Sequence, residues 1–211
     1  AIAAKVMMGK SLKELGFTSE IIPPYYSVKE AVFPFNKFQG VDPILGPEMK
    51  STGEVMGAGE TFGEAFFKAQ LGAGEVLPTE GTVFVSVRDA DKAGMIEVAK
   101  DLKTLGFNLV STAGTFETLS KAGVEVTRVN KVGEGRPHII DMMKNDEIAM
   151  SVNTTEGPVA IADSAEIRRC ALQHKVYCTT TLAGAVAVVE ALESDGLKTV
   201  RPIQDLHALI K

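Results

Sequence analysis

Hydroxyl groups, a lysine and a glycine stand at the points where two predicted strands give way to helices. Ser86 and Lys92 follow one strand, and Thr112, Gly114 and Thr115 follow the next. A helix N-terminus carries unpaired N–H groups and about half a positive charge, so an anion such as phosphate is stabilised there. Lysine adds a point charge that suits the same anion. The sequence therefore predicts a site for a phosphorylated ligand.

Two further strand ends carry polar residues of a different kind. Asn130 and Lys131 follow the third strand, and residues 153–155, Asn-Thr-Thr, follow the fourth. Amides and hydroxyls can both donate and accept hydrogen bonds, which suits a polar ring or a sugar. A serine or threonine at such a junction is, taken alone, more often a helix cap. The agreement of four strand ends is what favours a ligand site over isolated caps and a solvated Lys92.

The elements that must position these residues alternate between strand and helix. The predicted strands cover residues 83–87, 108–111, 124–129, 148–153 and 176–178. The predicted helices cover residues 91–105, 115–122, 138–145, 164–174, 182–192 and 203–210. Strands joined by helices form a parallel sheet covered on both faces, so the fold class is α/β with a five-stranded parallel sheet. Ligands of such folds bind beyond the carboxyl ends of the strands.

The chain is expected to divide near residue 73. Residues 74–81 are rich in glycine, proline and acidic side chains and are predicted to be a linker. Residues 82–211 hold the complete α/β pattern. Residues 1–73 supply too few elements to enclose a core of their own, so we expect an incomplete α+β segment, the remnant of a larger domain.

Four elements are expected within residues 1–73. They are a helix at 2–15 that stops at Gly16, an extended segment at 29–38, a loop at 40–59 and a helix at 61–71. Thr61 stands at the N-cap of the last helix with Glu64 three residues on, which is the pattern of a capping box. Glycine at the end of the first helix is typical of a C-terminal stop.

Composition excludes several classes of protein. The 211 residues carry a net charge of −5 and are 45% hydrophobic, which argues against a nucleic-acid interface and supports a packed core. No apolar run approaches the length of a membrane span, and we expect a cytoplasmic protein. Cys170 and Cys178 have too few histidine partners for a metal site and are expected to be buried free thiols. No Gly-x-Gly-x-x-Gly follows the first strand, which excludes a dinucleotide-binding module.

Two groups of motifs carry a resemblance to a known family. Residues 22–30, 34–38 and 45–57 resemble the end of the second ATP-grasp unit of carbamoyl-phosphate synthase large subunits. Residues 129–132, 134–138, 167–169 and 180–182 are similar to the regulatory domain of the same subunits, which belongs to the methylglyoxal-synthase-like superfamily. The resemblance implies a C-terminal fragment with a Rossmann-like regulatory domain. It covers nearly the whole chain.

The resemblance also implies what this chain lacks. Large subunits of the family use ATP with Mg or Mn to activate bicarbonate and phosphorylate carbamate, and a glutaminase small subunit supplies ammonia. The nucleotide and metal ligands lie upstream of the segments matched here, so we expect no catalytic, cofactor or metal site and an inactive fragment. Glu48, Glu54 and Arg88 are given structural roles. The parent enzyme would serve pyrimidine and arginine biosynthesis.

Bacterial members bind uridine monophosphate (UMP) as inhibitor and inosine monophosphate (IMP) as a competing effector. By motif, the effector phosphate is expected at Ser86, Lys92, Thr112, Gly114 and Thr115. Its ribose and base are expected at Lys131, Asn153, Thr154 and Thr155. Relatives that respond to N-acetylglutamate carry tryptophan at the position of Lys131, so lysine favours a nucleotide here.

Ornithine activates bacterial members from a site between the regulatory domain and the ATP-grasp unit. The matching residues are Glu30 and Thr180, while a tyrosine used by the family is replaced by Cys178 with Tyr177 beside it. Residues 30–59 are expected to relay effector binding to the ATP-grasp unit.

Two other kinds of function stay open. A free-standing lyase of the methylglyoxal synthase type, acting on dihydroxyacetone phosphate, would share the fold but would need a carboxylate base beside the phosphate. The loop at 133–138 lacks the Gly-Gly-Asp run of that enzyme and offers only Glu134. A pure interaction module is also possible, because an incomplete first part would expose a face.

Overall fold

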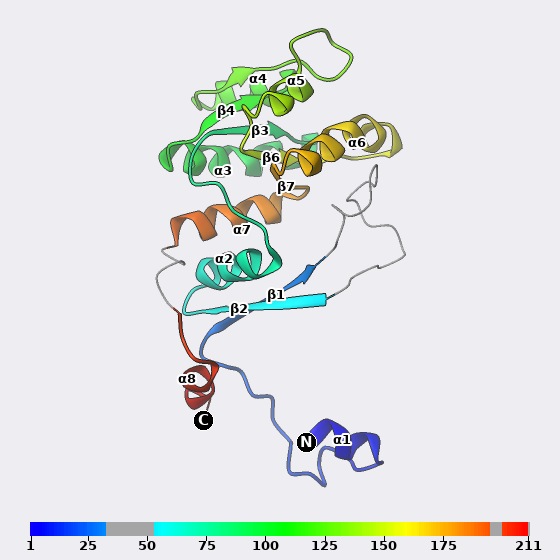
Figure 1. Cartoon of the computed structure of the whole chain (residues 1–211), viewed down its shortest axis with the longest axis vertical. Helices are drawn as coiled ribbons and strands as arrows, with labels where there is room; N and C mark the ends of the chain where they lie inside the picture. Colours follow the sequence, from blue (N-terminus) through cyan, green and yellow to red (C-terminus); the bar gives the residue numbers. More distant parts are fainter. Residues whose placement is uncertain (33–52, 195–199, 211) are drawn as a thin grey trace.

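The computed structural model describes residues 1–32, 53–194 and 200–210, and Figure 1 gives their arrangement. The main sheet of these ranges consists of β3 Thr82–Ser86, β4 Asn108–Ser111, β5 Thr127–Arg128, β6 Met150–Asn153 and β7 Tyr177–Thr179. Its strand order is β5-β4-β3-β6-β7 and every pairing is parallel. The predicted α/β class with a five-stranded parallel sheet is therefore confirmed.

Helices cover both faces of this sheet because alternate residues of β3 point to opposite sides. Val83 and Val85 belong to one apolar cluster and Phe84 to the other, and all three are fully buried. The first cluster takes side chains from α3 Lys92–Thr104, α4 Ala113–Lys121 and α7 Leu182–Glu193. The second takes them from α5 Ile139–Lys144 and α6 Pro158–Gln173. The helices that follow the neighbouring strands β3 and β6, α3 and α6, therefore pack on opposite faces of the sheet.

Two elements in this region begin more than two residues away from the expected position. The third strand was expected over 124–129, but only Thr127–Arg128 joins the ladder, because β5 is an edge strand with exposed residues paired to β4 alone. Helix α6 begins at Pro158, six residues before its expected start. Proline at the first helical position has its φ preset for a helix and needs no N–H partner there.

An antiparallel pair of strands and a helix lie beside the main domain. Strand β1 Tyr26–Val32 pairs with β2 Gly53–Gly59, and α2 Phe62–Ala73 packs on both strands and on α7. Figure 1 shows α7 between the main sheet and α2. The expected loop at 40–59 is wrong for residues 53–59, which form β2 by pairing with β1. Residues 33–38 and 40–52 lie outside the described residues.

Helix α2 comes close to α7 at a glycine. A Cβ atom on Gly63 would collide with the main-chain carbonyl of Glu190 on α7, so only a residue without a side chain allows this approach. Phe66 and Phe67 of α2 pack against the apolar cluster of the main domain. Residues of the N-terminal segment thus contact the α/β domain directly, and the proposed division into 1–73, 74–81 and 82–211 stays a prediction.

The first helix is shorter than the sequence pattern indicated. It was expected over 2–15, whereas α1 spans Ile2–Met7 and ends before Gly9, whose φ is +90°. None of its residues is buried. A helix that packs on nothing gains little from extending, because most helical stability in proteins comes from tertiary packing.

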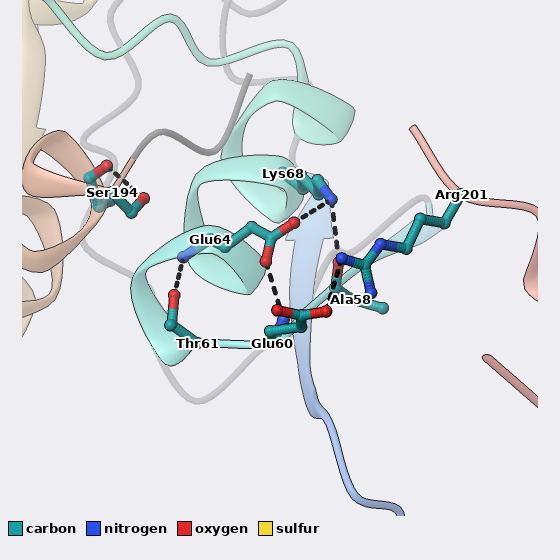
Figure 2. A network of polar contacts seen from close by, with 8 residues as sticks. Ala58, Glu60, Thr61, Glu64, Lys68, Ser194 and Arg201 are labelled. Atoms are coloured by element: carbon teal, nitrogen blue, oxygen red, sulfur yellow. Dashed lines mark hydrogen bonds and ion pairs between the residues drawn. The ribbon is translucent and has the colours of Figure 1, made fainter. Parts of the chain in front are cut away.

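Ion pairs and hydrogen bonds fix the start of α2 (Figure 2). Thr61 Oγ1 accepts a hydrogen bond from the Glu64 N–H at 3.2 Å, which confirms Thr61 as the N-cap. The Glu64 carboxylate accepts from the Glu60 N–H at 2.8 Å, one residue earlier than a capping box requires, and from Lys68 at 2.6 Å. Glu60 also pairs with Arg201 at 2.6 Å, just before α8 Ile203–Ala208. The C-terminal segment is thereby attached to the β2–α2 junction.

Candidate functional site

A cavity of about 460 Å³ lies at the carboxyl edge of the main sheet. All nine residues predicted to hold a nucleotide line it: Ser86, Lys92, Thr112, Gly114, Thr115, Lys131, Asn153, Thr154 and Thr155. They come from the ends of β3, β4 and β6, from the segment after β5, and from the first turns of α3 and α4. The structure thus brings the predicted residues together, while their effector-binding role stays a prediction.

Hydroxyl groups join β3 to the start of α4 on one side of this first cavity. Ser86 Oγ lies 3.0 Å from Thr112 Oγ1, and the Val87 N–H donates to Thr115 Oγ1 at 3.2 Å. Thr112 is the N-cap residue of α4, yet its hydroxyl makes no capping hydrogen bond and pairs with Ser86 instead. The first turn of α4 therefore faces the cavity without a side-chain cap, which is the arrangement that an anion requires.

The junction between β3 and β6 forms the other side. The Arg88 N–H donates to Thr154 Oγ1 at 3.1 Å, and the Thr154 N–H donates to the Ser86 carbonyl at 3.1 Å. Asn153 is only 2% exposed, and its Nδ2 has no hydrogen-bond partner among the described residues. Because a buried donor without an acceptor is costly, a ligand oxygen that reached Asn153 would gain a strong contact.

Two cations of the lining, Lys92 and Arg88, are each paired with a carboxylate; Asp89 also lines the cavity, whereas Asp91 does not. The Lys92 ammonium pairs with Asp89 at 2.7 Å, and the Arg88 guanidinium pairs with Asp91 at 2.8 Å. The hydrogen bond from Lys92 lowers the pKa of Asp89, and the hydrogen bond from Arg88 lowers that of Asp91. A Cβ atom on Gly114 would lie 3.1 Å from Lys92 Nζ, so glycine lets the ammonium approach the start of α4.

Several lining residues were not predicted as ligand contacts. They are Val87, Arg88, Asp89, Val132, Glu156, Ser164 and Ile167. Arg88 was given a structural role, and it does pair with Asp91, but it also faces the cavity. Ser164 and Ile167 reach the cavity from α6, which starts earlier than expected. The Gly157-Pro158 pair was the signal in the sequence for that start.

A second cavity, of about 360 Å³, lies where β1 and α2 meet β7 and α6. Both residues predicted for ornithine, Glu30 and Thr180, line it, as do Tyr177 and Cys178. Burial is the main cause that raises the pKa of Glu30 above its ordinary value, and the nearby charge of Glu75 acts in the same direction. Two carboxylates at one cavity favour a positively charged ligand.

The carboxylates considered for catalysis lie elsewhere or outside the described residues. Glu134 accepts a hydrogen bond from the Lys131 N–H at 3.0 Å and does not line the first cavity. Glu54 pairs with Lys29 at 2.8 Å, with more than half of each side chain exposed. Glu48 lies outside the described residues. The geometry therefore gives Glu134 the role of a loop cap and does not place it as a base beside the predicted phosphate site.

Both cysteines are free thiols, as expected; Cys170 is buried as expected, whereas the Cys178 residue is only half-buried. Burial raises the pKa of the Cys178 thiol to about 11, so it is protonated at neutral pH. Across the described residues no group of three or more histidine, cysteine, aspartate and glutamate side chains could hold a metal ion. Within the same ranges, no helix has the length and apolar character needed to cross a bilayer.

Comparisons with known proteins agree with the resemblance drawn from the motifs. Residues 94–180 match the model of the MGS-like domain family. Over 210 residues, the whole chain is 67% identical to the carbamoyl phosphate synthase large chain of Pseudomonas putida and 65% identical to that of Pseudomonas aeruginosa. Identity to the large chain of Vibrio cholerae is 54%, also over the whole chain. The chain spans about a fifth of the length of these relatives (20%). The motif-based resemblance is thereby confirmed: the chain matches part of the carbamoyl phosphate synthase large chain along its whole length, and a C-terminal fragment that carries an MGS-like domain fits this match.

Proposed function

We propose that this chain is the regulatory part of a glutamine-dependent carbamoyl-phosphate synthase large subunit and that its first cavity binds a nucleoside monophosphate. UMP is the inhibitor and IMP the competing effector. The observation that supports this proposal is the convergence of four strand ends on one cavity. The buried Asn153 Nδ2 at this cavity has no hydrogen-bond acceptor among the described residues. The parent enzyme would work in the cytoplasm with its glutaminase small subunit, in pyrimidine and arginine biosynthesis.

The two ends of the nucleotide would bind at different elements. The phosphate would lie at the uncapped start of α4, among the hydroxyls of Ser86, Thr112 and Thr115 and near the ammonium of Lys92. Ribose and base would then extend toward Asn153 and toward Lys131, Thr154 and Thr155. A phosphate at this position is stabilised both by the helix dipole and by charge-assisted hydrogen bonds.

Regulation requires that the effector bind two states of the large subunit with different affinities. Such coupling is typically about 1–3 kcal/mol. The close contact of α2 with α7 supplies a rigid connection between the regulatory domain and the β1–β2 pair, and the second cavity lies at the same junction. Ornithine would bind in that second cavity with its amino group near Glu30 and act as an activator.

The first cavity is tested with Lys92→Ala in the complete large chain. Calorimetry should show that UMP binds the unsubstituted protein. Lys92→Ala should lower the affinity for UMP by about tenfold or more, because hydrogen bonds to charged groups are worth about 1.5–3 kcal/mol. Lys100→Ala is the matched control, since Lys100 lies on the same helix and pairs with Glu97 away from the cavity. Uridine, which lacks the phosphate, should bind weakly to all three proteins.

Inhibition by UMP that survives unchanged in Lys92→Ala would show that the assignment is wrong. The lyase alternative has its own assay: dihydroxyacetone phosphate is added to the chain and methylglyoxal is measured. We expect none, since Glu134 caps a loop. We also expect the 211-residue chain alone to form no carbamoyl phosphate from bicarbonate, ammonia and ATP.

A further inference from the structure

Gln70 joins three elements at the second cavity. It lies on α2, its Nε2 donates to Glu30 Oε2 of β1 at 2.9 Å, and its Oε1 accepts from the Tyr177 hydroxyl of β7 at 3.2 Å. Gln70 is only 5% exposed. A buried amide with both ends bonded is held in one orientation, because losing either bond leaves a buried polar atom unpaired.

The chemistry of the two partners decides which way the amide faces. An ionised carboxylate can only accept hydrogen bonds, so Glu30 must face the NH2 group of Gln70. The amide oxygen is then left for Tyr177, which must donate and must therefore be protonated. Burial raises the pKa of Tyr177, which keeps its hydroxyl protonated at neutral pH. The chain of donors thus runs in one direction, from Tyr177 through Gln70 to Glu30.

We propose that Gln70 is the positioning residue of the second cavity: it fixes the Glu30 carboxylate for a ligand ammonium group and connects that carboxylate to the edge strand of the regulatory sheet. The ligand part of this inference rests on the function proposed above for the second cavity. Gln70 need not touch the ligand, because it acts by holding Glu30. It also transmits any movement of Glu30 to β7, since Tyr177 belongs to that strand.

The charge of Glu30 depends on the same contact. Burial and the charge of Glu75 raise the pKa of Glu30, while the hydrogen bond from Gln70 lowers it. The other titratable groups that line the cavity are Arg168, Tyr177 and Cys178. Removing the Gln70 amide leaves only the causes that raise the pKa. The Glu30 carboxylate would then take up a proton at a higher pH, and a cationic ligand would be released earlier as the pH falls.

The experiment measures ornithine binding to the complete large chain by calorimetry, from neutral pH downward. Gln70→Leu should weaken binding by about tenfold at neutral pH and should move the acidic limb of the affinity profile to higher pH. Tyr177→Phe should weaken binding and move the acidic limb in the same directions but to a smaller extent. The Gln70 amide then keeps its bond to Glu30 but loses its fixed orientation. Gln173→Leu, the same substitution at an exposed position on α6, is the matched control and should change neither quantity.

A purely structural role would lower the amount of competent protein without moving the acidic limb, so an unmoved limb in both Gln70→Leu and Tyr177→Phe overturns the inference. In a Glu30→Gln background, Gln70→Leu should have no further effect on ornithine binding, and a full additional loss would also overturn it. Thermal unfolding identifies a variant that does not fold, in which case Tyr177→Phe decides. If the unsubstituted protein binds no ornithine, the proposed ligand is wrong and the role of Gln70 in binding it is wrong too.

Discussion

The Lys92 ammonium lies 2.7 Å from the Asp89 carboxylate, although the Asp89 side chain is 94% exposed. Both residues line the first cavity, and Lys92 is the cation expected to meet the effector phosphate. The Asp89 carboxylate therefore makes the contact with Lys92 that an effector phosphate would make. An incoming phosphate has to displace it or share the lysine with a like charge, and either course reduces the affinity.

Replacing Asp89 by asparagine is expected to tighten UMP binding. Exposed ion pairs are weak, so the gain should be small, about threefold in the dissociation constant. Calorimetry at low ionic strength measures it, since salt screens the effect. Glu97→Gln is the control, because Glu97 pairs with Lys100 on the same helix outside the cavity. Weaker binding by Asp89→Asn would show that Asp89 supports the ligand instead of competing with it.

Thr115 is expected to matter for stability as well as for the effector. Thr115→Val keeps the shape but removes the oxygen that accepts from the buried Val87 N–H, and a buried donor left unpaired costs about 1–3 kcal/mol. Urea denaturation measures the loss. Thr118→Val, one turn further along α4, should cost far less, because Thr118 bonds the Gly114 carbonyl at an exposed position. Equal effects of the two substitutions would contradict this account.

The ion pair of Arg88 with Asp91 predicts an acid-sensitive contribution to stability. The hydrogen bond from Arg88 lowers the pKa of Asp91 below its ordinary value of 3.8. This contribution is present above that ordinary pKa and is lost as the pH falls through the lowered value. Asp91→Asn should therefore be less stable than the unsubstituted chain at neutral pH, and the gap should close in strong acid. Asp101→Asn on α3, the helix that follows Asp91, is the control, and unfolding by urea at several pH values is the measurement.

Gly63 is expected to be the sensitive point of the contact between α2 and α7. Gly63→Ala places a methyl group against the main-chain carbonyl of Glu190, so the helices must separate, at a cost of about 1–3 kcal/mol. Gly72→Ala on the same helix meets only Val55 at ordinary contact distances, 3.4 Å or more, and should stabilise the helix by about 0.5–1 kcal/mol. Thermal unfolding of the two variants should shift in opposite directions. Shifts in the same direction would show that the approach at Gly63 is not tight.

Periodicity was enough to predict the parallel sheet, since its strands lie in or beside short apolar runs between helical patterns, although β5 itself, Thr127–Arg128, is exposed. Periodicity was less reliable where tertiary contacts decide whether a segment forms a strand or a helix. Residues 53–59 are rich in glycine and lack an alternating pattern, and they form β2 because β1 offers a partner from a distant part of the chain. Residues 2–15 have a helical pattern, but only Ile2–Met7 is helical, and none of the described residues 2–15 is buried in a way that would stabilise a longer helix.

The candidate site was predicted in the same uneven way. Strand ends carry their polar residues in the sequence itself, so Ser86, Thr112 and Asn153 follow from the sequence alone. Asp89 and Ser164 could not, because Asp89 takes part through its side-chain pairing with Lys92 and Ser164 through the placement of α6 beside the strand ends. The contact of Gln70 with Glu30 joins residues 40 positions apart, which no local pattern encodes.

The sequence by itself determined the parallel α/β class, the polar residues at each strand end and the resemblance to carbamoyl phosphate synthase large chains. These follow from local periodicity, from the rule that carboxyl ends share one edge, and from long motifs. Only the tertiary structure decided which charges neutralise each other in the first cavity and how α2 meets α7. It also decided that one glutamine joins β1 to β7. The physical reason is that hydrogen bonds and close packing act over a few ångströms in space and not along the chain.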